Sequence, residues 1–341
     1  MQRCIELALL GSGNVAPNPM VGAVLVYENR IIGEGWHKKY GGPHAEVNCL
    51  DSVSETDIPL IAGSTLYVSL EPCAHFGKTP PCADLIIKNK IHKVVIGSRD
   101  PFTEVNGKGI EKLKNAGIEV MNGVLENECI ELNKRFFVFH TQQRPYIILK
   151  WAQTADGKIA GNTNERLLIS NEYANRLVHQ WRSEEAAILI GTNTALLDDP
   201  SLTNRLWKGN DPVRMVLDKE LRLPLHLKLF DRLQKTIVFN FIKQEENTNI
   251  IYHKINRQEN IIQQIRDASY RLGLQSILVE GGAQLLRSFI DAGVWDEARI
   301  ICNEELTITN GLNAPSPGRQ PERNEKLVSD TIFYYTNKPV N

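Results

Sequence analysis

The chain lacks the features that mark several large classes of protein. Its 39 lysines and arginines nearly balance its 40 aspartates and glutamates, so it has no basic excess of the kind that drives binding to a phosphate backbone. No apolar run approaches the ~18 residues of a membrane span. Glu6 interrupts the short apolar stretch near the start, where a signal peptide needs a longer one. These absences predict a cytoplasmic protein without a nucleic-acid or membrane partner.

Cysteine is too sparse for a disulfide framework, which belongs to small secreted domains. Of the six cysteines, four have no local pattern and are expected to be small buried thiols: Cys4, Cys49, Cys129 and Cys302. Repeats and low-complexity tracts are absent, and 42% hydrophobic with 23% charged residues is ordinary for a folded chain. At roughly 150 residues a domain, the length predicts two domains.

Strand-like and helix-like runs alternate along the chain, which predicts an α/β fold. The polar run Thr141–Pro145 interrupts the alternation, and Pro145 disfavours a helix at the residue before it. We therefore expect an α/β domain at 1–142 and a second at 143–341. The predicted strands are Gly22–Tyr27, Arg30–Trp36, Thr65–Leu70, Lys93–Ser98, Tyr146–Trp151, Ala186–Gly191, Val213–Leu217, Thr236–Phe241, Ser276–Val279 and Thr331–Tyr335. One predicted helix follows Pro43, and the others span Cys82–Lys90, Gly109–Ala116, Asn171–Arg182, Ile261–Leu272 and Ala283–Ala292. Residues Pro315–Glu325 are expected to form a mobile loop.

A His, a Glu and two Cys in the first half form a pattern typical of catalytic zinc. His44-Ala45-Glu46 stands where the chain is expected to enter a helix, Pro72-Cys73 follows a predicted strand, and Cys82 comes nine residues after Cys73. One imidazole and two thiolates leave the fourth position of Zn²⁺ open for a water, whose pKa the metal lowers to roughly 7. Positions two apart do not share a helix face, so Glu46 is interpreted as a proton carrier and not as a ligand. The combination matches the zinc nucleobase deaminase signature.

Interpretations without catalysis also account for some of these residues. A His-x-Glu sequence arises by chance in many chains, and two cysteines nine apart also suit a structural zinc clasp or two buried thiols. The joint occurrence of all four residues, in the right order and beside the right predicted elements, favours the catalytic interpretation.

The eight residues between Cys73 and Cys82 indicate which family of zinc deaminases the chain resembles. Nucleoside and tRNA deaminases usually hold two residues there. The segment Ala74–Pro81, with Ala16–Ala23 and Gly33–His37, closely resembles the bifunctional riboflavin-biosynthesis deaminase/reductase family. Four stretches of the second half resemble it too: Leu149–Gly157, Ile190–Thr194, Asp198–Thr203 and Leu278–Gly282. The resemblance implies a cytidine deaminase-like N-terminal domain and a dihydrofolate reductase-like C-terminal domain, and assembly beyond the monomer.

In that family the first domain deaminates a diaminopyrimidinone that carries ribose 5-phosphate. By resemblance, zinc is held by His44, Cys73 and Cys82, Glu46 shuttles protons, and the substrate lies among Asn18, His37, His75, Lys78 and Asp100. Lys78 suits a phosphate and the histidines suit hydrogen bonds to the ring or phosphate, although all three side chains could equally be solvated surface residues. Phe102 stands where the family often has Asn.

The second domain of the family uses NADPH to reduce the ribosyl side chain to ribityl, with a hydride passing to C1′ of the opened sugar. The resemblance places the cofactor against Ala152, Leu167, Thr194, Asp198, Lys219, Gly282, Ala283, Gln284, Leu285, Leu286, Arg287 and Ser288. It places the substrate against Glu165, Arg182, Leu202, Arg205 and Glu280. Glu165, Leu167 and Lys219 depart from the usual residues, and Asn303–Glu305 and Asn310–Leu312 replace a segment of lysine and glycine.

Independent of the family, Glu280-Gly281-Gly282 joins a predicted strand to a predicted helix, where free N–H groups suit an anion. A plain strand-to-helix turn explains the same residues. No Gly-x-Gly-x-x-Gly follows a predicted strand, so a standard Rossmann dinucleotide site is not supported. Arg182 and Arg205 suit a phosphate, or a solvated surface.

The sequence thus predicts a two-step enzyme of riboflavin biosynthesis that takes a small phosphoribosyl pyrimidine, with Zn²⁺ and NADPH as cofactors. Two alternatives stay open. One is a tRNA or free-nucleoside deaminase, and the other is a zinc domain joined to a non-catalytic nucleotide-sensing domain.

Overall fold

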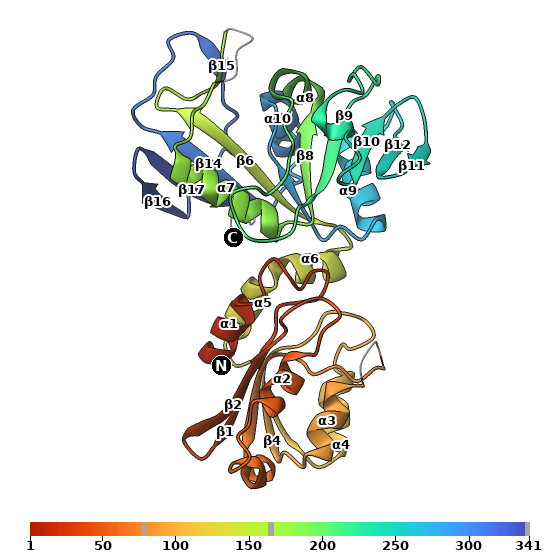
Figure 1. Cartoon of the computed structure of the whole chain (residues 1–341), viewed down its shortest axis with the longest axis vertical. Coiled ribbons are helices and arrows are strands. Elements are labelled where there is room, and N and C mark those ends of the chain that lie inside the picture. The colour runs from red at the N-terminus through yellow and green to blue at the C-terminus, as the bar shows by residue number, and fades with distance from the viewer. Residues whose placement is uncertain (77–79, 163–166, 338–341) are drawn as a thin grey trace. The chain divides into compact units, whose positions relative to one another are not determined.

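The computed structural model describes residues 1–76, 80–162 and 167–337. The chain divides into two compact units, Met1–Gln143 and Arg144–Asn341, and the division falls next to the boundary expected after residue 142 (Figure 1). The predicted site residues Lys78 and Glu165 lie outside the described residues.

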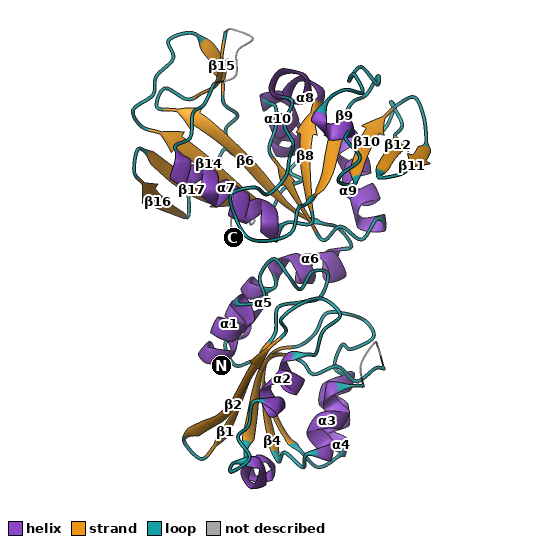
Figure 2. Cartoon of the chain, viewed as in Figure 1, coloured by secondary structure: helices purple, strands orange, loops and turns teal. Residues whose placement is uncertain are grey.

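The first unit is built on a five-stranded mixed sheet in the order β2-β1-β3-β4-β5. β1 pairs antiparallel with β2 and β3, whereas β3, β4 and β5 run parallel. Helices cover both faces of this sheet (Figure 2). The strands are β1 Gly22–Tyr27, β2 Arg30–Trp36, β3 Thr65–Leu70, β4 Lys93–Ser98 and β5 Glu119–Asn122. The helices are α1 Gln2–Leu9, α2 Ala45–Asp51, the 3₁₀ turn Ile58–Gly63, α3 Cys82–Lys88, α4 Lys108–Asn115, α5 Glu126–Leu132 and α6 Lys134–Gln142.

Two glycines bring α2 directly onto β2. A Cβ atom at Gly35 would lie 2.2 Å from the Cys49 nitrogen, and one at Gly33 would lie 2.6 Å from the Cys49 oxygen. Only glycine permits such a close approach of helix and strand backbones. The contact fixes where α2 begins and therefore where His44, its N-cap residue, stands.

The second unit contains a ten-stranded sheet in the order β11-β12-β10-β9-β8-β13-β6-β14-β17-β16. Its seven strands from β12 to β14 are parallel, and β11, β17 and β16 are antiparallel at the edges. β7 and β15 pair antiparallel in a separate two-stranded sheet. The strands of the unit are β6 Tyr146–Thr154, β7 Lys158–Gly161, β8 Ala187–Gly191, β9 Val213–Leu217, β10 Thr236–Asn240, β11 Glu245–Asn247, β12 Ile250–Lys254, β13 Ser276–Val279, β14 Glu297–Asn303, β15 Gly311–Asn313, β16 Arg323–Leu327 and β17 Asp330–Thr336. The helices are α7 Glu172–Glu184, α8 Thr192–Asp198, the 3₁₀ turn Lys228–Phe230, α9 Ile261–Arg271 and α10 Ala283–Asp291.

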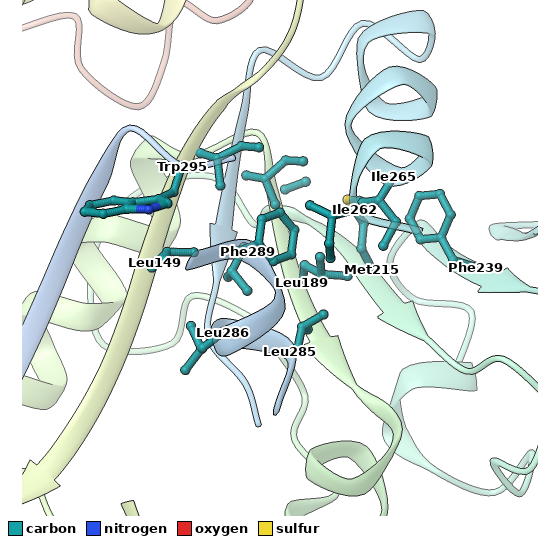
Figure 3. Packing of buried hydrophobic residues seen from close by; sticks show 14 of the residues in the cluster. Leu149, Leu189, Met215, Phe239, Ile262, Ile265, Leu285, Leu286, Phe289 and Trp295 are labelled. Carbon is teal, nitrogen blue, oxygen red and sulfur yellow. The ribbon is translucent and has the colours of Figure 1, made fainter. Parts of the chain in front are cut away.

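Helices α9 and α10 pack on one face of this sheet and form its larger core (Figure 3). Phe289 of α10 is fully buried against strand residues such as Leu149 and Leu189. These strands are buried on both faces, which is why they appear in the sequence as continuous apolar runs. None of the helices in the described ranges has the length and apolarity that a membrane crossing requires.

The predicted hairpin Gly22–Tyr27/Arg30–Trp36 is confirmed, and the other predicted elements are found with ends shifted by a few residues. The loop expected at Pro315–Glu325 is wrong in its last three residues, which belong to β16. That strand lies at the sheet edge with exposed polar side chains, so it has no hydrophobic alternation to reveal it. Strand β14 was missed because Glu297 and Arg299 interrupt its apolar pattern, although both are buried and hydrogen-bonded to each other.

Candidate functional site

The three expected metal ligands converge in the first unit. Cys73 follows β3, Cys82 begins α3, and His44 caps α2. His44 Nδ1 lies 3.7 Å from Cys73 Sγ and 3.3 Å from Cys82 Sγ, and the three atoms all lie within 4.8 Å of one another. The residues are half-buried or buried. Residues up to 38 positions apart in sequence therefore meet at one point.

This triangle fits a tetrahedral zinc ion. With a Zn–N distance of about 2.0 Å and a Zn–S distance of about 2.3 Å, tetrahedral angles place a nitrogen and a sulfur ligand about 3.5 Å apart. The two measured N···S distances, 3.7 and 3.3 Å, bracket that value. Three protein ligands leave a fourth position open, as in catalytic zinc sites.

The electrostatics of the cluster also suit a cation. The Cys82 thiol donates to Cys73, and this hydrogen bond lowers the pKa of Cys73 to about 4 while it raises the pKa of Cys82. The Cys82 backbone N–H donates to Cys73 Sγ at 3.3 Å. One thiolate is thus already favoured, and a metal that binds both sulfurs displaces the proton they share.

Glu46 is buried directly beside these ligands. It is 3% exposed, and burial raises the pKa of its carboxyl group. The neighbouring His44 and Cys82 side chains oppose this shift, and Cys73 adds to it. The premise that Glu46 and His44 stand on different faces of one helix is wrong, since His44 is extended and lies before the first turn of α2. The side chains converge because the backbone changes direction at the N-cap.

His37 and Asn18 are joined to each other near the cluster. His37 Nδ1 lies 2.9 Å from the Pro43 carbonyl oxygen and therefore carries the proton that it donates, so its Nε2 accepts from Asn18 Nδ2 at 3.1 Å. The ring of His37 stands edge-on to that of His44, with centroids 5.6 Å apart. The expectation that His37 donates to substrate does not fit this tautomer, because its N–H is already used.

Phe102 lies beside two histidines of the deaminase domain. Its ring lies edge-on to His75 and to His140, with centroids 6.2 and 5.1 Å away. Nδ1 of His75 is buried with no hydrogen-bond partner among the described residues. An aromatic face therefore stands beside His75, where the family often has an amide.

Asp100 follows β4, at the same edge of the sheet as Cys73. It is 7% exposed, and burial raises the pKa of its carboxyl group to about 7, with a smaller contribution from Glu71. The Phe102 N–H donates to Oδ1 at 2.8 Å and opposes the shift. The group thus changes charge near neutral pH.

We expect Asp100→Asn to change how stability depends on pH. The folded pKa of about 7 lies above the ordinary value of 3.8, so the favourable contribution is complete below pH 3.8 and is lost as pH rises through 7. Between about pH 5 and pH 7 the wild-type free energy of unfolding should fall by about 2 kcal/mol relative to Asp100→Asn. Urea titrations at both pH values measure the difference. Parallel pH profiles for the two proteins would contradict the buried, protonated carboxyl.

In the second unit, Arg182 of α7 and Glu280 after β13 form a buried bidentate ion pair. Arg182 Nε and Nη2 donate to the two carboxylate oxygens at 2.8 and 2.7 Å. Burial alone raises the pKa of Glu280, but attraction to Arg182 and Lys150 outweighs it and lowers the pKa to about 2. Both residues were predicted to meet substrate, and the structure places them in contact across 98 positions of sequence.

The same helix holds the loop that contains Arg205. Arg182 Nη1 donates to the Thr203 carbonyl at 3.3 Å, and the Arg205 N–H donates to His179 Nδ1 at 2.9 Å. Burial and the neighbouring arginines lower the pKa of His179 to about 4, so it is neutral and accepts. Arg205 itself is exposed, and Leu202, which has a positive φ of 51°, is buried.

Sequence reasoning missed His179 and Lys150 as members of this site. Burial lowers the pKa of Lys150, and Glu280 opposes the shift. The sequence did contain an indication for Lys150, because a lysine inside the apolar strand Tyr146–Trp151 is unusual. For His179, whose role is an internal hydrogen bond to a loop, no local pattern exists.

The expected cofactor residues lie at the carboxyl ends of parallel strands. α8 follows β8, α10 follows β13, and Thr194 lies against the glycine turn, since a Cβ at Gly282 would be 3.3 Å from its Oγ1. Gly282 has φ 75° and caps α10, so the turn presents a helix N-terminus suited to phosphate. This donor set fits a dinucleotide.

Not all of the expected cofactor side chains are accessible. Ala283, Leu285 and Leu286 are buried, and the two leucines belong to the core, so only their backbone can face a ligand. Gln284 and Arg287 are exposed on the other side of α10, and Ser288 donates to the Gln284 carbonyl at 2.9 Å. The remaining positions are less enclosed. Ala152 on β6, Leu167 and Asp198 are half-buried, and Lys219 is exposed two residues after the end of β9.

Comparison with known proteins matches both units. The family described as "Cytidine and deoxycytidylate deaminase zinc-binding region" matches residues 1–98, and the "RibD C-terminal domain" matches residues 145–303. Fold and site therefore define a class of enzyme in which a zinc-binding deaminase domain is joined to an NADPH-dependent reductase domain.

The relatives identify the family. "Riboflavin biosynthesis protein RibD" of Aquifex aeolicus is 42% identical, over 98% of this chain and 97% of its own, and that of Actinobacillus pleuropneumoniae is 38% identical, over 93% and 85%. A solved diaminohydroxyphosphoribosylaminopyrimidine deaminase/5-amino-6-(5-phosphoribosylamino)uracil reductase of Thermotoga maritima is 37% identical with a TM-score of 0.88, over 98% of this chain and 96% of its own. The chain belongs to the RibD family of bifunctional riboflavin-biosynthesis enzymes.

Family membership confirms the predicted fold class, the predicted bifunctional activity and the two predicted cofactors. Since the match runs through both domains, a lone nucleoside or tRNA deaminase and a non-catalytic sensing domain are set aside.

Proposed function

We propose that His44, Cys73 and Cys82 hold the zinc ion of the deaminase domain and that Glu46 moves the protons of the reaction. Bound Zn²⁺ supplies a Lewis acid that lowers the pKa of a water to roughly 7. Glu46 takes the proton from that water and returns it to the nitrogen that leaves the pyrimidine as ammonia. The observation that carries this assignment is the meeting of three ligand atoms within 4.8 Å beside a buried carboxylate.

Around this centre, we propose that the diaminopyrimidine phosphate lies among Asn18, His75, Asp100 and Lys78. Asp100 and Cys73 both follow parallel strands at one sheet edge, which supports a shared site. His37 is proposed as a support of Asn18 and not as a donor, because its Nε2 accepts from that amide.

For the reduction we propose a site at the carboxyl ends of β6, β8 and β13. NADPH supplies the hydride. The α10 N-terminus at Gly282 and the neighbouring Thr194 bind the cofactor's phosphates, and Arg182, Arg205 and Glu280 orient the phosphoribosyl substrate. Support comes from the buried Arg182–Glu280 pair and from the two hydrogen bonds that tie α7 to the Thr203–Arg205 segment.

Removal of zinc tests the proposed metal site and the proposed reduction site in one sample. After chelation, ammonia release from the diaminopyrimidine phosphate should fall by at least about 100-fold, because no group lowers the pKa of the attacking water. NADPH oxidation with the deaminated intermediate should keep its rate, since no metal ion takes part in the proposed reduction. Added Zn²⁺ should restore ammonia release. Unchanged deamination in the zinc-free protein would overturn the metal assignment, and loss of both activities would overturn the independence of the two sites.

We further propose the cytoplasm as the location and a homo-oligomer as the assembled form. The first rests on six free cysteines, which suit a reducing compartment, and on the near-zero net charge. The second rests on the family resemblance alone. Together with the absence of a nucleic-acid partner, these stay predictions.

A further inference from the structure

Glu71 is a buried carboxylate that directly precedes the Pro72-Cys73 dipeptide. It is 4% exposed, and its own N–H donates to the Ser98 carbonyl at 3.0 Å. Within the described residues, its two oxygens accept hydrogen bonds from backbone N–H groups, two for each oxygen. Oε1 accepts from Gly109 at 3.0 Å and Ile110 at 3.1 Å, and Oε2 accepts from Gly107 at 2.9 Å and Asp100 at 3.3 Å.

These four bonds join three separate pieces of the deaminase domain. Gly107 is the N-cap residue of α4 and Gly109 and Ile110 lie in its first turn, where free N–H groups favour a negative charge. Asp100 belongs to the segment that follows β4. Through one side chain, the end of β3 is therefore fixed to the start of α4 and to Asp100.

A steric contact strengthens the same junction. A Cβ atom at Gly109 would lie 2.0 Å from the Pro72 carbonyl oxygen and 3.2 Å from Glu71 Oε1. The first turn of α4 thus rests directly on the peptide that precedes Cys73. Any displacement of that turn is transmitted to Cys73 through backbone atoms, with no flexible side chain in between.

We propose that Glu71 is a positioning residue of the metal centre, which holds the Pro72-Cys73 backbone so that Cys73 Sγ stays within reach of His44 and Cys82. It touches neither substrate nor metal. The inference rests on the proposed ligand set. Groups that orient metal ligands typically contribute about 10- to 100-fold to metal affinity or activity.

Glu71→Gln tests this role with little change of volume. A carboxylate accepts at both oxygens, whereas an amide places an NH₂ donor against two of the four N–H groups. We expect zinc affinity, measured by competition with a chromophoric chelator, to fall by about 10- to 100-fold. The visible absorption of bound Co²⁺, which depends on the arrangement of its thiolate ligands, should shift in position or intensity. A purely structural role lowers the melting temperature and leaves that spectrum unchanged in the folded protein.

Gly109→Ala tests the junction without touching the carboxylate, and it decides the question if Glu71→Gln does not fold. The added methyl group pushes on the Pro72 carbonyl, so the same loss of affinity and the same spectral change are expected. Glu111→Gln is the matched control, since Glu111 is an exposed acidic residue of the same first turn. It should match the wild type in both measurements.

The outcomes separate this inference from the proposed function. If the wild-type protein binds no Co²⁺ or Zn²⁺, or binds it equally well after Cys73→Ser, the ligand set itself is wrong. If the wild type binds as proposed and the folded Glu71→Gln protein has its affinity and spectrum, the positioning role is wrong. Where Glu71→Gln yields no folded protein, wild-type affinity and spectrum in Gly109→Ala overturn the positioning role in the same way.

Discussion

Glu46→Gln should slow ammonia release strongly and leave the zinc ion in place. The amide fills the same volume but cannot take up and return a proton, so the rate of deamination should fall by about 10²- to 10⁴-fold. Zinc content should stay at the wild-type level, because the ligand atoms belong to His44, Cys73 and Cys82. Steady-state ammonia release and metal analysis on the same preparation give both numbers.

The other half of the chain provides an internal control. NADPH oxidation with the deaminated intermediate should be unaffected by Glu46→Gln, since the substitution lies in the other unit. Glu55→Gln, at an exposed position of the deaminase domain, should leave both activities unchanged. Normal ammonia release by Glu46→Gln would show that another group carries the proton, and loss of zinc would show that Glu46 supports the ligands.

Glu280→Gln should cost about 3–5 kcal/mol of unfolding free energy, because it leaves the guanidinium of Arg182 buried without its counter-charge. The side chains of the pair are 13% and 7% exposed, so water compensates little of the loss. Reduction should be lost as well, since the proposed substrate site contains the pair. Denaturant titration of the reductase domain measures the stability change, and NADPH oxidation measures the activity.

The stabilising effect of the Arg182–Glu280 pair should decrease as the pH falls. The folded pKa of about 2 lies below the ordinary value of 4.5, so the pair's contribution is complete above pH 4.5 and is lost as pH falls toward 2. The wild type should therefore lose about 3 kcal/mol across that window, and Glu280→Gln should not.

The matched control for the ion pair is Glu220→Gln. It breaks the Glu220–Arg257 pair, whose side chains are 43% and 57% exposed, and should cost under about 1 kcal/mol. Equal costs for Glu280→Gln and Glu220→Gln would contradict the buried pair as a source of stability.

Strands buried on both faces were the elements that the sequence predicted well. Runs such as Thr65–Leu70 and Ser276–Val279 are largely apolar because little in them faces water. Several elements with a solvated or ion-paired face were missed, among them β14, β16 and the helices α1, α5, α6 and α8. Their patterns depend on partners that lie elsewhere in the chain or on short-range ion pairs, as in the Arg299–Glu297 contact of β14.

The predicted sites divide in a similar way. The metal ligands and Glu46 were recognised because ligand chemistry restricts such a site to a few residue types at characteristic spacings. His179 and Glu71 were not recognised, because each acts by accepting backbone N–H groups from a distant segment. A residue that accepts hydrogen bonds from a distant backbone segment has no characteristic spacing to its partner in the sequence.

By itself, the sequence determined the kinds of chemistry in this protein: two thiols and an imidazole for a metal, a carboxylate for protons, and glycines at a helix start for an anion. Only the tertiary structure decided which groups meet. Arg182 reaches Glu280 across 98 positions, and Glu71 reaches Gly109 across 38. The physical reason is that side-chain identity fixes what a group can donate, accept or ligate, whereas its partner is fixed by the packing of strands and helices that are remote along the chain.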